Sequence, residues 1–398
     1  MLNTIINTLW IVFQILIGYN LALPIVIFLL HTILLKKKIN PKAGSNNPEA
    51  DYAIIVTAYE QTHTLPTVVE SLLKLQYGNY LIYIVADKCD ISNLKFADDR
   101  VIVLRPPETL ASNTRSHFYA INNFKRPHDR LTIIDSDNLV EPDYLSQLNV
   151  CFDEGYVAVQ GERKAKNMDT TYACIDAARD IYYHFYDGKI LFEVGSSATL
   201  AGSGMAFTVK LYRECLEHLD VTGAGFDKVL QKEIITRNYR IAFTNKAIVY
   251  DEKTSQSDQL VKQRARWINT WFKYFIFGFQ IIGLGIRRCN WNQFLFGFIL
   301  LRPPLFIFLL LSVVLMGINL FISPFIALVW LIGFALFVIG FFTALLLSPT
   351  DKRIYKALTG IPKFIFFQVL SLLKAKNANK HSVATQHFHA KKIEEIKE

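Results

Sequence analysis

Three long apolar segments, one near the start of the sequence and two near its end, constrain the fold of this chain most strongly. Leu9–Leu35 has no formal charge except what His31 could carry. A helix of this length, at about 1.5 Å per residue, would cross a hydrocarbon core of about 30 Å. Phe294–Leu320 and Phe325–Leu347 are two further segments of this kind, joined by a short polar connection. The sequence therefore predicts a membrane protein with three spanning helices.

Charged residues beside the apolar segments predict their orientation. Lys36–Lys38 follow the first segment, and Asp351–Arg353 follow the third. A secretory signal would place its positive charges first and end at a small-residue cleavage site, so we interpret the first segment as a retained anchor. By the positive-inside rule, the residues between the anchor and the second segment face the cytoplasm. We expect a multi-pass protein of the cell inner (plasma) membrane with a cytoplasmic domain.

The charge balance and the cysteines exclude several other classes. The net charge of +9 comes largely from clusters that flank the apolar segments, where they would contact anionic lipid headgroups. Nucleic acid is a poorer partner, because no single basic stripe lies on the soluble part. The five cysteines are widely spaced and form no Cys-x-x-Cys motif, which argues against a zinc site or a disulfide framework.

Arg302 lies inside the second apolar segment, just before Pro303 and Pro304. An arginine in an apolar run is costly unless it reaches the interface or is paired. One interpretation is that it snorkels to the inner membrane surface. The other is that it lines a polar path or contacts a phosphate.

The sequence between the membrane segments alternates strand and helix patterns. Buried strands are predicted at four apolar runs: Tyr52–Val56, Leu81–Val85, Val101–Leu104 and Leu131–Ile134. Helices are predicted at Pro66–Leu75 and at about Ser112–Asn123. This order is typical of a parallel sheet with helices on both faces. Ligands bind such sheets beyond the carboxyl ends of the strands.

Polar side chains follow these strands where they end. Asp135 and Asp137 come directly after the fourth strand, and residues two apart along a strand point to the same side. Such a pair of carboxylates suits Mg²⁺ or Mn²⁺, which prefer oxygen ligands. On its own, the pair is also typical of a solvated turn. Tyr59 and Glu60 follow the first strand and Asp87 the second, so the carboxylates of three strand ends would meet at one edge.

Three motifs in the second half complete a recognisable order. They are Ala201-Gly202-Ser203-Gly204-Met205-Ala206-Phe207, Gly225-Phe226-Asp227-Lys228 and Gln263-Arg264-Ala265-Arg266-Trp267. With the first half, they resemble the membrane-bound family 2 glycosyltransferases, a group that includes cellulose, hyaluronan, chitin and poly-N-acetylglucosamine synthases. The resemblance implies an α/β fold of the GT-A class, a Rossmann-like cytosolic domain with flanking transmembrane helices. It also implies that Gly202–Gly204 form a small-residue loop near the acceptor.

The resemblance implies roles for residues of the first half toward a nucleotide-sugar donor. Tyr59 and Glu60 would lie in the loop that meets the nucleoside, and Asp87 would hydrogen-bond the nucleobase. Asp137 would be the direct metal ligand, while Asp135 would contact the donor sugar or ribose.

The resemblance also implies roles for residues toward the acceptor and the diphosphate. Asp227 stands at the place of the general base. Gln263, Arg266 and Trp267 match the motif on a helix that closes over the diphosphate and the acceptor. Arg115 stands where relatives often carry a lysine that meets the donor.

Simpler interpretations exist for some of these residues. Asp227 could cap a helix that begins near Lys228. Trp267 could belong to an interfacial aromatic belt, and Arg266 could be an ordinary basic residue near the headgroups.

The expected organisation divides the chain into six parts: an N-terminal transmembrane anchor at 1–40, a linker at 41–50, a GT-A domain at 51–271, an interfacial helix at 272–290, a two-helix transmembrane hairpin at 291–348, and an interfacial helix with a cytosolic tail at 349–398. The expected activity is inverting, metal-dependent transfer of a hexosyl or N-acetylhexosaminyl group, with UDP as the expected nucleotide. The acceptor would be a polysaccharide or a lipid-linked glycan of the cell envelope. Three spans are few for a polymer channel unless a partner subunit or a second copy completes it. The alternative is a non-catalytic membrane assembly subunit derived from such an enzyme.

Overall fold

The computed structural model describes residues 2–34, 49–379, 389 and 391–397. Lys36–Lys38 and most of the predicted linker at 41–50 lie outside these residues. The helices of the soluble part are α2 (Leu65–Leu73), α3 (Asn113–Asn122), α4 (Tyr144–Asp153), α5 (Thr171–Tyr183), the π-helical segment η1 (His184–Ile190), α6 (Leu191–Glu193), α7 (Val209–Leu216), α8 (Phe226–Thr236), α9 (Ser257–Tyr274) and α16 (Glu394–Lys397). The other helices are α1 (Leu2–Leu34), α10 (Ile276–Arg287), α11 (Trp291–Leu301), α12 (Leu305–Ile322), α13 (Pro324–Leu347), α14 (Lys352–Ala357) and α15 (Ile361–Lys374).

One mixed sheet organises the soluble part. Its strands are β1 (Tyr52–Tyr59), β2 (Tyr80–Asp87), β3 (Val101–Leu104), β4 (Arg130–Asp135), β5 (Leu139–Val140), β6 (Ala158–Ala165), β7 (Met205–Thr208) and β8 (Ala242–Asp251). They pair in the order β3-β2-β1-β4-β7-β6-β8-β5. The first four strands are parallel, as the sequence predicts, whereas β7 runs antiparallel to both of its neighbours.

The pairing register brings the polar strand ends together. Tyr59 on β1 is opposite Asp87 on β2, and Thr57 on β1 is opposite Asp135 on β4. The carboxyl ends of three parallel strands therefore lie at one edge of the sheet, as expected from their order.

The sheet is buried on both faces. Along β1, Ala53 and Ile55 belong to the hydrophobic core on one face, while Ile54 and Val56 belong to the core on the other. This alternation follows from the two-residue period of a strand, and burial on both faces explains the continuous apolar run. The first of these cores does not end at the sheet, because it also contains Leu21 of α1 and buried residues of α11, α12 and α13.

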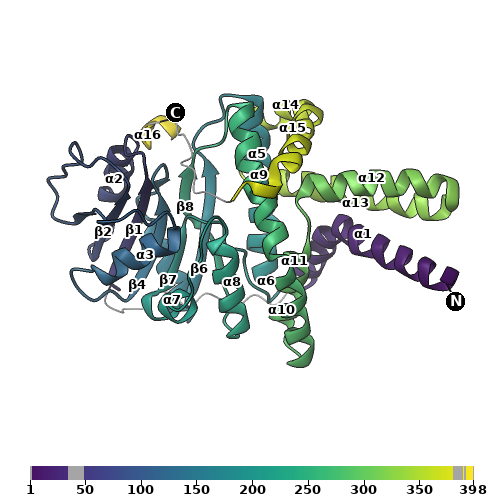
Figure 1. Ribbon diagram of the computed structural model, residues 1–398, viewed down its shortest axis with the longest axis horizontal. Helices are drawn as coiled ribbons and strands as arrows, with labels where there is room; N and C mark the ends of the chain where they lie inside the picture. Colours follow the sequence, from purple (N-terminus) through teal and green to yellow (C-terminus); the bar gives the residue numbers. More distant parts are fainter. Residues whose placement is uncertain (1, 35–48, 380–388, 390, 398) are drawn as a thin grey trace.

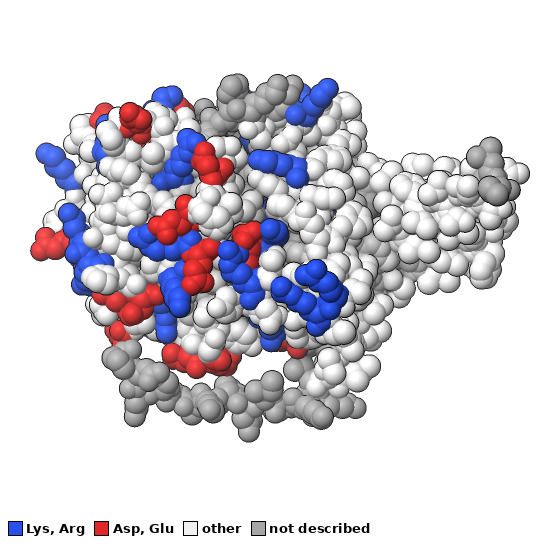
Figure 2. All heavy atoms as spheres, turned by 60° about the horizontal axis from the view of Figure 1, so that its bottom comes forward, with Lys and Arg blue, Asp and Glu red and all other residues white. Residues whose placement is uncertain are grey.

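The apolar helices form a separate projection. In Figure 1, α1, α12 and α13 extend away from the sheet on one side, whereas α10 and α15 lie at the base of this projection and run across it. In the view of Figure 2, acidic and basic side chains are mixed over the surface of the soluble part, and the projection carries neither. Within the described residues, four helices are long and apolar enough to cross a membrane: Asn3–Leu34, Leu305–Ile322, Pro324–Leu347 and Lys352–Lys374. The chain is therefore a membrane protein.

Two predicted boundaries in the membrane part are wrong. The predicted span Phe294–Leu320 is not one helix, because α11 ends at Leu301 and α12 begins at Leu305. Pro303 and Pro304 lack the backbone N–H that a continuous helix needs, and a proline moves the residue before it away from helical geometry. The predicted interfacial helix at 272–290 also begins later, because α9 continues to Tyr274 and α10 starts at Ile276.

Candidate functional site

A cavity of about 890 Å³ lies beside the polar edge of the sheet. Its walls come from the ends of β1, β2, β4 and β8, from α5, α8 and α9, and from the apolar helices. Of the residues predicted from the sequence, it is lined by Tyr59, Asp87, Asp135, Asp137, Asp227, Gln263, Arg266 and Trp267. Glu60 and Arg115 do not line it.

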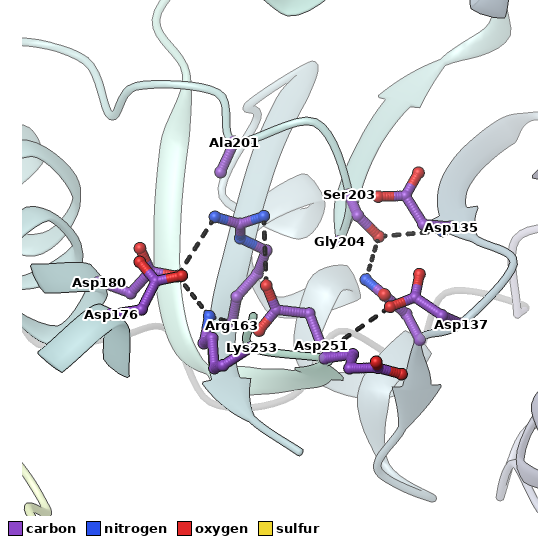
Figure 3. A network of polar contacts seen from close by, with 12 residues as sticks. Asp135, Asp137, Arg163, Asp176, Asp180, Ala201, Ser203, Gly204, Asp251 and Lys253 are labelled. Carbon is purple, nitrogen blue, oxygen red and sulfur yellow. Dashed lines mark hydrogen bonds and ion pairs between the residues drawn. The ribbon is translucent and has the colours of Figure 1, made fainter. Parts of the chain in front are cut away.

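Hydrogen bonds with neighbouring side chains hold the Asp135–Asp137 turn, among them one to Ser203 (Figure 3). The Asp135 N–H donates to the Ser203 hydroxyl at 3.1 Å. With its amide nitrogen facing Asp137, Asn138 donates to Asp137 Oδ1 at 2.9 Å and accepts from the Ser203 hydroxyl at 2.8 Å. The Lys166 ammonium donates to the Asp137 backbone carbonyl at 2.7 Å. The turn is therefore rigid, and both carboxylates reach the cavity wall.

The small-residue loop splits into two roles. Gly202 has φ +87°, lines the cavity and has open space where a side chain would stand. Ser203 is fully buried and supports the acidic turn, while a side chain at Gly204 would meet Val249 at 3.0 Å. Only Gly202 therefore leaves the bare backbone that the resemblance predicts near an acceptor.

The acidic turn carries negative charge that the protein does not fully neutralise. Burial raises the pKa of Asp135 to about 7, and repulsion from Asp137 adds to the rise. Among the described residues, no group of three His, Cys, Asp or Glu side chains is arranged to hold a metal ion. A divalent cation on Asp137 would fit this excess of charge, with diphosphate oxygens and water completing its shell.

In metal-free protein, we expect an Asp135→Asn variant to become more stable than the parent as the pH rises. The pKa of Asp135 is raised from 3.8 to about 7, so the folded state holds a proton that the unfolded state has released. Stability from this group is present below about pH 4 and is lost as the pH rises through about 7. The free energy of unfolding, measured by chemical denaturation in detergent with EDTA, should favour the variant by about 3 kcal/mol more at pH 8 than at pH 5. In an Asp137→Asn variant, the free energy of unfolding should depend less on pH than in the parent, because the repulsion that raises the pKa of Asp135 is gone. If the difference in stability between the parent and the Asp135→Asn variant did not change with pH, the assignment of this pH dependence to Asp135 would be contradicted.

A network of buried ion pairs lies next to the acidic turn, and sequence reasoning missed it. Lys253 Nζ lies 2.5 Å from Asp180 Oδ2 and 2.6 Å from Asp251 Oδ1. Arg163 reaches between the same two aspartates, at 3.4 Å and 3.5 Å (Figure 3). Although burial opposes it, Lys253 and Arg179 hold the pKa of Asp180 well below its usual range. The run Asp176, Arg179, Asp180 in a helix with mostly apolar neighbours was the available sequence signal.

This network also anchors α9, the helix that carries the Gln-x-x-Arg-Trp motif. The buried guanidinium of Arg264 pairs with Asp176 of α5. The Trp267 ring contacts Arg264 and Arg179, whose guanidinium carbons lie 4.1 Å and 4.6 Å from its centroid. Gln263 Oε1 accepts from the Thr254 hydroxyl at 3.0 Å. The motif is thus held at the cavity by charges from α5, and Trp267 remains 38% exposed.

Asp176→Ala should lower the free energy of unfolding by about 3 kcal/mol, because it leaves the buried Arg264 without its carboxylate. Thermal unfolding in detergent measures the loss. Adding Arg264→Met to the Asp176→Ala variant should restore part of it, which a double-mutant cycle quantifies. Glu217→Ala, which breaks an exposed ion pair with Arg213, is the matched control and should cost less than about 1 kcal/mol. Equal losses in the buried and exposed pairs would contradict this role of Asp176.

Asp227 lies in the first turn of α8, at the cavity wall. The residue at the N-cap is Gly225, with φ +102°, and no side chain caps the helix. The interpretation of Asp227 as a helix cap is therefore wrong. A side chain at Gly225 would meet Thr270 at 2.5 Å and Tyr274 at 2.8 Å, so α9 packs directly against the start of α8. Lys228 Nζ lies 3.3 Å from Asp227 Oδ2.

His184 also lines the cavity, next to the acidic groups of α5. Burial lowers its pKa to about 3, which makes it a poor proton acceptor at pH 7.

The remaining predicted residues are engaged with the protein. Both carboxylate oxygens of Asp87 accept backbone N–H groups, from Leu110 at 2.9 Å and Ala111 at 2.8 Å. The Glu60 carboxylate pairs with Lys88 at 2.7 Å outside the cavity. The Arg115 guanidinium pairs with Asp220 at 2.6 Å on the surface. The structure thus brings Asp87 to the cavity as the support of a loop, and it does not bring Glu60 or Arg115 there.

Arg302 lines the cavity wall. Its buried guanidinium pairs with Asp187 of η1. Of the two interpretations, this buried pairing at the cavity wall favours the one in which Arg302 lines a polar path.

A comparison with protein-family models matches residues 48–270 to "Glycosyltransferase like family 2". No curated protein sequence was found to match the chain. Among solved structures, the mannosyltransferase PcManGT from Pyrobaculum calidifontis, in complex with GDP-Man and Mn²⁺, has a TM-score of 0.50 at 13% identity, covering 90% of this chain and 97% of that one. S. aureus TarS 1–349 in complex with UDP-GlcNAc has a TM-score of 0.44 at 10% identity, covering 83% of this chain and 90% of that one. The family match and the fold of the mannosyltransferase confirm the predicted GT-A class of fold.

Proposed function

The chain belongs to glycosyltransferase family 2, and from this premise we propose that it is an inverting, metal-dependent enzyme that moves a sugar from a nucleotide-sugar to an acceptor at the cytoplasmic membrane face. One observation carries the proposal: Asp137, Asp227 and Arg266, which lie far apart in the sequence, line the same cavity. The fully buried Ser203 beneath the acidic turn supports it further.

The donor is a nucleotide-sugar whose diphosphate lies beside Asp135 and Asp137. Asp137 would hold Mg²⁺ or Mn²⁺, which neutralises charge on the leaving diphosphate. Arg266 supplies charge-assisted hydrogen bonds to the same group. The mannosyltransferase PcManGT was solved with GDP-Man and Mn²⁺, and TarS with UDP-GlcNAc. For this chain we propose a UDP-sugar of the hexose or N-acetylhexosamine class.

The acceptor hydroxyl loses its proton to Asp227, since a carboxylate within reach of the hydroxyl can act as general base. Trp267 and Gly202 border the acceptor side, where the aromatic face supports a sugar ring and the bare backbone lets it approach. The polar network of Asp180, Arg163 and Lys253 lies next to the acidic turn and helps to hold α9, which carries Trp267, at the cavity.

The reaction should invert the configuration at the anomeric carbon. With one base and no second carboxylate acting as nucleophile, the acceptor displaces the diphosphate directly from the opposite face. Proton NMR of the first product formed, read from the coupling of its anomeric proton, measures the outcome. Retention of the donor's configuration would contradict direct displacement.

We further propose that this chemistry takes place beside lipid, in the synthesis of an exopolysaccharide or a cell-envelope glycan. The apolar helices that form part of the cavity wall support this proposal. We propose that α10 and α15 lie at the inner interface, because they run across the projecting helices (Figure 1). Arg287 and Arg288 at the end of α10 would then meet anionic headgroups.

The test is turnover by the purified full chain in lipid with a panel of nucleotide-sugars. We expect release of nucleoside diphosphate from at least one donor, dependent on Mn²⁺ or Mg²⁺ and abolished by EDTA. Release that persists with EDTA would contradict the metal-dependent mechanism. Absence of release from every donor, with and without cell-envelope lipid extract as acceptor, would favour the alternative of a non-catalytic assembly subunit.

A further inference from the structure

The cavity has a second end, which is apolar and belongs to the membrane helices. Beyond the acidic turn and Asp227, its walls are formed by side chains of α12, α13 and α15, among them Leu305, Leu309, Phe337, Phe341 and Ile365. The projection that carries α12 and α13 bears no charge in the view of Figure 2. One continuous space therefore runs from the carboxylates at the edge of the sheet to a hydrocarbon-like wall.

Arg302 lies where the polar and apolar ends meet. It follows the last residue of α11, and its backbone is extended (φ −60°, ψ 122°) because Pro303 comes next. The break between α11 and α12 turns its side chain into the cavity wall.

The pairing of Arg302 leaves hydrogen-bonding capacity unused. Its Nη2 contacts Asp187 Oδ2, and its guanidinium carbon lies 5.3 Å from the centroid of the Tyr183 ring. Among the described residues, no hydrogen bond to its Nε or Nη1 is found, and Asp187 Oδ1 is buried without a partner. A guanidinium with free N–H groups at a cavity wall suits a phosphate, which it can hold through two parallel hydrogen bonds.

An apolar wall discriminates between the two acceptor classes. A polysaccharide threaded past Leu305, Leu309 and Phe337 would bury hydroxyl groups without hydrogen-bond partners, which is unfavourable. A hydrocarbon chain would instead gain from contact with these side chains. Along the cavity wall, the carboxylates come first, then the guanidinium of Arg302, then the apolar side chains. A lipid-linked sugar has the matching order, because its sugar is followed by a phosphate and then by a hydrocarbon chain.

We propose that the acceptor is a lipid-linked sugar whose phosphate binds Arg302 and whose hydrocarbon chain lies against α12, α13 and α15. This inference rests on the proposed function, since it names the acceptor of the same site. The acceptor hydroxyl oxygen forms a bond to the anomeric carbon of the donor, and its proton passes to the Asp227 carboxylate. The bond between that carbon and the diphosphate oxygen breaks, and its electron pair leaves with the nucleoside diphosphate.

Binding of three probes to the full chain in lipid nanodiscs tests the inference. Farnesyl diphosphate carries both a chain and a phosphate head, farnesol carries the chain alone, and inorganic diphosphate the head alone. Titrations are made in EDTA, so that no probe binds through a metal at Asp137. We expect farnesyl diphosphate to bind at least about tenfold more tightly than either of the other two.

The decisive variant removes the ion pair as a unit, because Arg302→Met alone would leave Asp187 buried and uncompensated. In Arg302→Met/Asp187→Leu, affinity for farnesyl diphosphate should fall by about tenfold to a hundredfold, while affinity for farnesol stays within about twofold. Arg302→Lys, which keeps the charge but loses the two-pronged geometry, should fall in between. Arg213→Met, on the exposed surface of α7 where Arg213 pairs with Glu217, is outside the cavity lining. It is the matched control and should bind all three probes as the parent does.

The outcomes separate this inference from the proposed function. Equal affinity of the parent for farnesyl diphosphate and farnesol, or an unchanged affinity in both Arg302 variants, would overturn the phosphate site. If the parent still cleaves a nucleotide-sugar with metal in that case, the proposed function stands and only the acceptor class is wrong. If the parent cleaved no nucleotide-sugar at all, the proposed function would be refuted, whatever the probes show.

Discussion

An Asp137→Ala variant should lose nucleoside diphosphate release by on the order of 10³-fold or more. Asp137 is the carboxylate proposed to hold the metal, and its side chain lies at the end of a turn fixed by Ser203 and Asn138. Without it, the leaving diphosphate would lose the countercharge of the metal, and preorganised groups of this kind are each worth factors of about 10²–10³. The measurement is turnover across a range of Mn²⁺ concentrations in lipid, so that weaker metal binding is separated from loss of the chemical step.

Asp99→Asn is the matched control for that experiment. Asp99 is exposed in the loop before β3 and does not line the cavity, so its variant should keep the parent's rate and metal dependence. If the Asp137→Ala variant retained turnover within about threefold of the parent at every Mn²⁺ concentration, the metal could not be held at the acidic turn.

Asp227→Asn should lower kcat by about 10²–10⁴-fold while leaving the KM for the donor nearly unchanged. Asparagine keeps the shape of the side chain in the first turn of α8 but cannot accept the hydroxyl proton. Since no side chain caps α8, the substitution removes no cap, and stability should change little. Steady-state kinetics with a saturating acceptor extract give both constants.

The control for the base is Asp220→Asn. This exposed carboxylate pairs with Arg115 on the surface, and neither residue lines the cavity. Its variant should therefore turn over as the parent does. A fall in kcat that was equal for the Asp220 and Asp227 variants would show that charge in general, and not a base at α8, limits the rate.

The four parallel strands β1 to β4 and their polar edge were predictable because their signals are local, whereas the other four strands of the mixed sheet were not predicted. Buried parallel strands read as continuous apolar runs, and the carboxylates after β4 follow such a run directly. The fixed order of the parallel strands then brings Asp87 and Asp135 to one edge. The contribution of α9 was predictable for another reason, namely the resemblance of its Gln-x-x-Arg-Trp motif to a family.

What the sequence did not reveal depends on distant partners. Arg302 gave two interpretations, because nothing near it in the chain identifies Asp187 as its carboxylate. Arg115 occupies a plausible place in the order of motifs, yet Asp220, more than a hundred residues away, holds it at the surface. The break between α11 and α12 is different, because Pro303 and Pro304 are a local signal for it in the sequence. The prediction of one continuous span did not take these prolines into account.

The network of Asp176, Asp180, Arg163 and Lys253 was missed for the same reason as the partner of Arg302. Each residue reads as an ordinary surface charge on its own helix or strand. Only the tertiary fold shows that Asp176, Asp180 and Lys253 are buried together and that the partly buried Arg163 pairs with Asp180. Charged residues within a mostly apolar helix such as α5 therefore point to a buried polar site when several of them fall on consecutive turns.

The hydrophobic core that begins on one face of the sheet and continues into α1, α11, α12 and α13 bears on how the enzyme can be handled. A truncated chain without those helices would present the uncovered face to water and would lose part of the cavity wall. The catalytic part is thus not an independent soluble fragment tethered to a passive anchor. Detergent or lipid is a requirement for its integrity from the first step of purification, and inhibitors should be screened on the intact, solubilised protein.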